Sequence, residues 1–213
     1  MFPAFPQSGH LVLIGLTIGF SIAAPLGPIG LLCIRRAVTE GARAGFVCGL
    51  GAATADAGYA FIGGFAMSAL ARWLVQEQRW FAVAGGLFLT CLGLRTLGAK
   101  QAHAAAAPAG RGALSAYGST LLLTLANPMT MVSFAAVFAG LGVAGAASYA
   151  AGATLVAGVF AGSALWWLLL SGICGRARRR IGPGAMQWLN RGCGLVLAGF
   201  GSYAIARAIL AMV

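Results

Sequence analysis

Long apolar runs with almost no charge dominate this sequence, and they decide which solvent the chain can fold in. The 213 residues are 60% hydrophobic and only 8% charged, whereas a soluble globular domain carries about 25% charged residues. A helix needs about 20 residues to cross the roughly 30 Å hydrocarbon core of a bilayer. The runs here reach that length, so the sequence predicts an all-α integral membrane protein with no room for a soluble domain.

Charged and turn-forming residues divide the apolar sequence into six expected transmembrane helices. These helices cover approximately residues 9–34, 44–70, 81–97, 116–141, 149–173 and 189–211. The connections between them are short, and none is large enough to fold by itself.

Basic residues lie at the ends of the apolar runs, so the net charge of +11 indicates orientation and no nucleic-acid partner. The loops after the first, third and fifth helices, with their flanks, hold most of this charge: Arg35, Arg36, Arg43, Arg95, Lys100, Arg111, Arg176, Arg178, Arg179 and Arg180. Since Lys and Arg favour the cytoplasmic side, we expect these loops in the cytoplasm and both termini outside.

Two of the six helices carry prolines in their interior. The first contains Pro25, Gly27 and Pro28, and the fourth contains Asn127 and Pro128. Pro28 and Pro128 are 100 positions apart (128 − 28), and "LGAAT" at 50–54 is echoed by "AGAT" at 151–154. We therefore expect two inverted three-helix repeats, about 9–98 and 114–213, joined by a linker at 99–113 within one transporter domain spanning 1–213.

Proline removes a helical N–H and clashes with a preceding carbonyl, so each break frees backbone polar groups that lipid cannot satisfy. Each break also starts a new half-helix whose N-terminus is a partial positive pole, and Asn127 is placed to cap one of them. Two such poles can receive an anionic group such as a carboxylate. The alternative is that the prolines only kink the helices to improve packing.

Asp56 is the only acidic residue inside an expected span, since Glu40 and Glu77 lie in loops. A carboxylate at the centre of a membrane helix costs about 2.5–3.5 kcal/mol, so it needs a partner or a function. Desolvation disfavours its charged form, which allows proton exchange near neutral pH. The alternative is a structural salt bridge to Arg95 or another arginine; Tyr59, one turn on, is expected to pack.

Catalytic and metal-binding patterns are missing from the sequence. The five cysteines form no CxxC pair and have no histidine at ligand spacing: Cys33, Cys48, Cys91, Cys174 and Cys193. No Ser-His-Asp set, phosphate loop or carboxylate pair can be assembled either. We expect neither an enzyme nor a bound cofactor or metal.

The segment "PLGPIGLLCIRRAVTEGARAGFVCGLGAATADAGYAF", followed by "LANPMTMVSFAAVFAGL", resembles the lysine exporter (LysE) family. The resemblance covers nearly the whole chain. It implies an exporter in the bacterial inner membrane for amino acids or related small metabolites, coupled to H⁺ or Na⁺ and able to form a homodimer.

The resemblance implies, position by position, that the functional candidates are Pro25, Gly27, Pro28, Asp56, Asn127 and Pro128. From the chemistry of a carboxyl inside the membrane, we also expect Asp56 to couple substrate movement to H⁺. Many members carry a basic or polar residue after Asn-Pro, where this chain has Met129.

Two other functions remain open. A membrane thiol–disulfide electron carrier of related architecture needs a cysteine beside the proline in both broken helices, but only Cys33 is near one. A divalent-metal exporter needs several intramembrane carboxylates or histidines, and Asp56 is the only one available.

Overall fold

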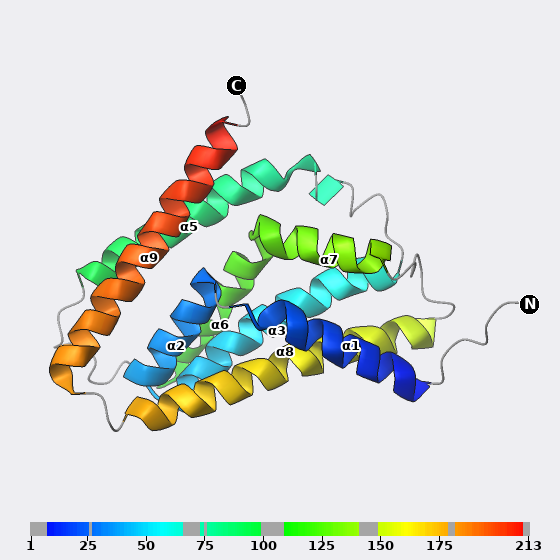
Figure 1. The fold of residues 1–213 in the computed structure, drawn as a ribbon, viewed down its shortest axis with the longest axis horizontal. Helices are drawn as coiled ribbons and strands as arrows, with labels where there is room; N and C mark the ends of the chain where they lie inside the picture. Colours follow the sequence, from blue (N-terminus) through cyan, green and yellow to red (C-terminus); the bar gives the residue numbers. More distant parts are fainter. Residues whose placement is uncertain are drawn as a thin grey trace, which may run out of the picture.

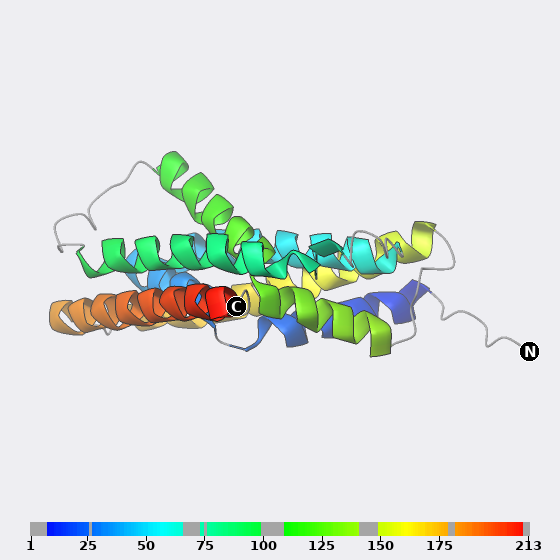
Figure 2. The same ribbon diagram turned by 90° about the horizontal axis from the view of Figure 1, so that it is seen from above.

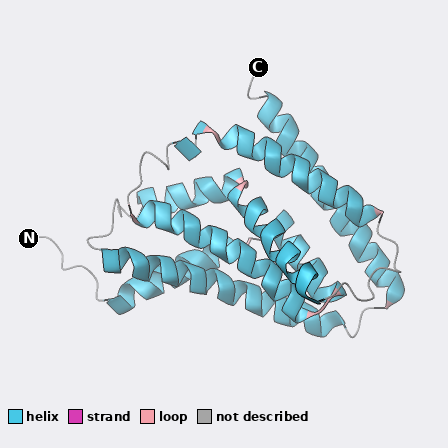
Figure 3. Cartoon of the chain, turned by 180° about the vertical axis from the view of Figure 1, so that it is seen from behind, coloured by secondary structure: helices cyan, strands magenta, loops and turns pink. Residues whose placement is uncertain are grey.

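The structure is a computed structural model that describes residues 8–25, 27–65, 73–74, 76–98, 109–140, 149–178 and 182–210. Within these ranges the fold is helical and contains no strand (Figures 1 and 3). The helices are α1 (Ser8–Ala23), α2 (Pro28–Thr39), α3 (Ala42–Gly64), α5 (Gln78–Leu97), α6 (Ala109–Leu125), α7 (Pro128–Gly140), α8 (Tyr149–Ala177) and α9 (Pro183–Leu210).

Four of these helices, α3, α5, α8 and α9, are long and apolar enough to cross a membrane by themselves. The pairs α1/α2 and α6/α7 meet the same requirement only when each pair is taken as one bent span, with bends of 85° and 61°. The described residues thus provide four to six candidate spans, which confirms the expected all-α membrane fold. The first and fourth expected helices are the broken ones, and the second ends at Gly64, so residues 66–70 of its expected range lie outside the described residues.

Local sequence explains where the bent spans break. A residue that precedes proline is biased away from helical geometry, and α1 and α6 end shortly before Pro25 and Pro128. Pro28 and Pro128 then occupy the first position of the next helix, where the missing N–H costs nothing. The tight turn from α2 into α3 uses Gly41 at φ 108°, a conformation that residues with a Cβ rarely adopt.

Glycines allow the closest helix contacts. Gly19 of α1 faces Val159 of α8, and Gly162 of α8 faces the backbone of Leu16, so α1 and α8 touch along their length. Gly93 and Gly201 do the same between α5 and α9, which lie side by side in Figures 1 and 2. Small residues at helix crossings increase van der Waals contact, which is a main source of stability inside lipid.

Helix α3 lies at the centre, packed against α8 on one side and α6 on another. Its residues enter two buried clusters, one that includes Ala52 and Ala53 and one that includes Tyr59 and Ala60. Asp56 lies between these clusters along α3. The fold therefore encloses the only acidic residue of the spans at the middle of the bundle.

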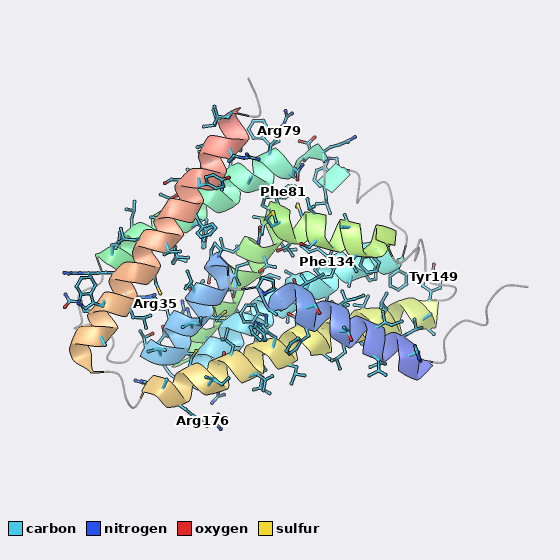
Figure 4. The ribbon with its side chains drawn as sticks, in the orientation of Figure 1. Arg35, Arg79, Phe81, Phe134, Tyr149 and Arg176 are labelled. Carbon is cyan, nitrogen blue, oxygen red and sulfur yellow. The ribbon has the colours of Figure 1, made fainter. Side chains whose placement is uncertain are left out.

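The two ends of the bundle differ in charge. Figure 4 shows Arg35 and Arg176 at one end, where α2 leads into α3 and α8 leads towards α9, and Tyr149 at the opposite end. At the arginine-rich end, Arg35 Nε donates a hydrogen bond of 2.8 Å to Asn190 Oδ1 of α9. The described helix ends that flank two of the three loops expected in the cytoplasm, α2/α3 and α8/α9, thus lie at one end of the molecule.

Candidate functional site

The break in the first span leaves the N-terminus of α2 without a side-chain cap. Gly27 is the N-cap residue, its backbone is extended, and Pro28 follows at the first helical position. The first N–H groups of a helix have no partner within the helix, and they carry partial positive charge. The start of α2 can therefore donate hydrogen bonds to an anionic group.

The break in the second span has a different structure. Asn127 Oδ1 accepts a 3.1 Å hydrogen bond from the Met129 N–H, and the Asn127 carbonyl accepts one of 3.2 Å from the Met131 N–H. The expected cap by Asn127 is thus present. On the other side of the break, the Tyr59 hydroxyl donates a 2.6 Å hydrogen bond to the Leu125 carbonyl. Backbone groups freed by the break find partners inside the protein, as a membrane interior requires.

Asp56 is 3% exposed and has a hydroxyl partner. Ser163 Oγ of α8 donates a 2.7 Å hydrogen bond to Asp56 Oδ2, and Trp167 Nε1 donates one of 3.2 Å to Ser163 Oγ. Among the described residues the ion pair is Arg36 with Glu40, and Asp56 has no arginine partner. The carboxyl is therefore held by Ser163, which in turn accepts a hydrogen bond from Trp167, and not by a salt bridge.

A pocket of about 80 Å³ joins these features. Five of the six residues expected from the sequence line it, namely Pro25, Gly27, Pro28, Asp56 and Asn127. The sixth, Pro128, begins α7 but is not among the lining residues. The Asp56 carboxyl, the uncapped start of α2 and the Asn127 amide thus line one pocket.

Sequence reasoning missed four polar residues of this site. Thr124, Thr130 and Trp167 line the pocket, and Ser163 donates a hydrogen bond to Asp56. Ser163 and Trp167 are four residues apart, so they share one face of α8. This four-residue spacing, next to Gly162, was the one sequence signal for a polar face on α8. Small residues in α8 are equally typical of helix packing, so the signal was not specific. Met129, where the chain departs from many LysE proteins, is 70% exposed and lies outside the pocket.

A pocket lined by several polar groups in a helical membrane bundle, at the point where two spans are interrupted, is typical of secondary transporters. The fold and the pocket define the class of protein as a multi-pass membrane transporter. A family model described as LysE type translocator matches residues 20–207. The chain therefore belongs to the LysE family of translocators, which confirms the resemblance seen in its motifs.

One curated relative is similar over almost its whole length. It is ChpE of Pseudomonas aeruginosa, described as a chemotactic transduction protein, which is 27% identical over 200 residues. The aligned region covers 92% of this chain and 97% of ChpE. No solved structure gives a significant match.

The electron-carrier alternative needs a cysteine in both broken spans, and the second broken span, α6 and α7, has none. Cys33 of α2 and Cys48 of α3 are fully buried in one apolar cluster. In the described part of the chain no group of three or more His, Cys, Asp or Glu side chains gathers, so a metal-exporter function also lacks a supporting observation there.

Replacing all five cysteines by alanine is expected to leave transport largely unchanged, because buried thiols here act as small packing groups. The cavities left at Cys33 and Cys48 should lower stability by about 1 kcal/mol each. Transport rate and melting temperature of the purified variant check this. Loss of activity in Cys33→Ser alone, at normal protein level, would instead favour a thiol–disulfide mechanism.

Proposed function

We propose that this transporter exports amino acids, or closely related small zwitterions, from the cytoplasm across the bacterial inner membrane in exchange for H⁺. One observation carries the proposal: Asp56 and the uncapped start of α2 line the same pocket. No catalytic role is assigned to these residues.

A zwitterion needs a partner for each of its charges when it leaves water. The Asp56 carboxylate can bind an ammonium group, and the N–H groups at the start of α2 can bind a carboxylate. Both lie on the wall of one small pocket. The pocket chemistry therefore favours a substrate that carries both signs over a simple cation or anion.

Exchange for H⁺ follows from the single carboxyl. When the ammonium leaves, Asp56 is a buried negative charge with one hydroxyl donor, Ser163. Burial favours neutralisation of such a group by a proton. Binding of substrate and binding of H⁺ at Asp56 then exclude each other, which is the requirement for antiport.

The helix contacts support two inverted repeats, α1–α5 and α6–α9. Under such a symmetry α1 corresponds to α6, α3 to α8 and α5 to α9. The most extensive helix pairs are α1 with α8, α3 with α6, α3 with α8, and α5 with α9. The symmetry turns the α1/α8 pair into the α3/α6 pair. It leaves the α3/α8 pair and the α5/α9 pair unchanged, since each joins two corresponding helices. The pocket then lies at the interface of the repeats, where alternating access can open it to either side.

Reporter fusions test the proposed orientation, in which the arginine-rich end of the bundle is cytoplasmic. A phosphatase that is active only outside the cytoplasm is expected to be active when fused after α7, before Tyr149, and inactive when fused after α8, before Pro183. The reverse pattern would contradict the orientation and the direction of export.

An export assay tests the substrate class. Cells that overproduce the protein and cells that do not are loaded with each of the twenty amino acids, and efflux into the medium is followed. We expect faster efflux for at least one amino acid. Equal efflux of all twenty from both kinds of cell, at verified protein level in the membrane, would contradict the proposal.

A further inference from the structure

The Thr124 side chain has no hydrogen-bond partner although it is buried. Thr124 lies near the end of α6, just before the break, and is 2% exposed. Its Oγ1 atom is shielded from solvent and makes no hydrogen bond. It also lines the pocket that contains Asp56. Buried hydroxyls are nearly always paired, so an unpaired one on a pocket wall needs an explanation.

Other threonines of this chain show what Thr124 does not do. Seven of the nine threonines donate a hydrogen bond to the carbonyl four residues earlier: Thr17, Thr39, Thr54, Thr90, Thr96, Thr120 and Thr154. The other two, Thr124 and Thr130, are those that line the pocket. A helical threonine normally uses this local bond to satisfy its hydroxyl. Thr124 lacks it, so its hydroxyl, beside the pocket, has a donor that no described residue uses.

We propose that the Thr124 hydroxyl is a substrate-binding group that donates a hydrogen bond to the carboxylate of the transported amino acid. This inference rests on the proposed function. Asp56 is an acceptor and fits the ammonium group, so the carboxylate lies with the donors. These donors are the N–H groups at the start of α2 and the Asn127 amide nitrogen, because Asn127 Oδ1 already accepts from Met129.

Thr124→Val tests the inference, because valine keeps the shape of the side chain and removes the donor. Hydrogen bonds to charged groups are strong, so the KM in proteoliposomes should rise about tenfold or more. The rise should be similar for every transported amino acid, because the carboxylate is common to all. Thr124→Ser keeps the hydroxyl and should restore a KM near that of the wild type.

Thr120→Val is the matched control. Thr120 lies one turn earlier on α6, donates to the Cys48 carbonyl at 2.6 Å, and is outside the pocket. This variant should lose stability and keep the wild-type KM. Thr124→Val should show the opposite pattern, with an unliganded melting temperature equal to or above that of the wild type, because it removes an unpaired polar group.

The probes are the twenty L-amino acids and the carboxamide of each one that is transported. A carboxamide has no carboxylate charge, so Thr124→Val should weaken its binding less than that of the parent amino acid. An unchanged KM in Thr124→Val, a rise confined to one kind of amino-acid side chain, or a lower unliganded melting temperature would overturn this inference alone. Failure of the wild type to transport any of the twenty would overturn the proposed function and this inference with it.

Discussion

Replacing Asp56 by asparagine is expected to abolish transport while leaving folded protein in the membrane. Asparagine keeps the size of the side chain, and its carbonyl oxygen can still accept the hydrogen bond from Ser163. It cannot carry the negative charge that pairs with an ammonium group, nor bind and release a proton. Loss of one partner of a buried charge pair costs about 3 kcal/mol or more, which corresponds to a fall in rate of about a hundredfold or more. Uptake of labelled amino acid into proteoliposomes measures it.

Two variants separate the role of Asp56 from a general effect of charge. Asp56→Glu keeps the carboxyl but moves it by one methylene, so part of the activity should remain. Glu40→Gln removes a carboxylate outside the pocket, where Glu40 pairs with Arg36 at 3.2 Å, and should transport like the wild type. Wild-type rates in Asp56→Asn would show that the carboxyl is structural and that the proposed mechanism is wrong.

Gly162→Ala should cause a large loss of stability. A methyl group at this position of α8 would overlap the carbonyl oxygen of Leu16 on α1, and both are backbone positions that cannot turn away. The two helices must move apart to make room for the methyl group. We expect the free energy of unfolding to fall by about 3 kcal/mol, as in a severely overpacked core. For a chain of this size we expect the melting temperature to fall by about 10 °C, as measured on the purified protein.

Gly199→Ala is the matched control for this prediction, because a methyl group at Gly199 of α9 would meet no atom within 4 Å. Alanine is also the better helix former by about 1 kcal/mol, so this variant should melt at or above the wild-type temperature. If Gly162→Ala has the same melting temperature as the wild type, the close contact between α1 and α8 does not exist in the membrane.

The breaks and the buried carboxyl could be predicted from the sequence because each depends on local chemistry. Proline interrupts a helix wherever it falls in the interior, and one Asp among apolar residues is visible without a fold. The start of α2 and Asn127 were expected near an anionic group for the same reason, and both line the pocket with Asp56.

The partners of these residues could not be predicted, since they depend on how helices distant in sequence pack. Ser163 lies 107 positions from Asp56, and a serine in a small-residue stretch of α8 is typical of packing. The unpaired state of Thr124 is a property of its rotamer, which no sequence pattern encodes. The two breaks also differ in a way that similar prolines do not reveal, because Asn127 caps α7 whereas Gly27 leaves α2 open.

Proton movement driven by an amino acid shows directly whether Asp56 exchanges substrate for H⁺. Purified protein is placed in vesicles that contain a pH-sensitive dye, and a transported amino acid is added on one side. We expect the wild type to move protons against the direction of the amino acid and Asp56→Asn to move neither. Amino-acid transport by the wild type without proton movement, or unchanged proton movement in Asp56→Asn, would contradict this exchange.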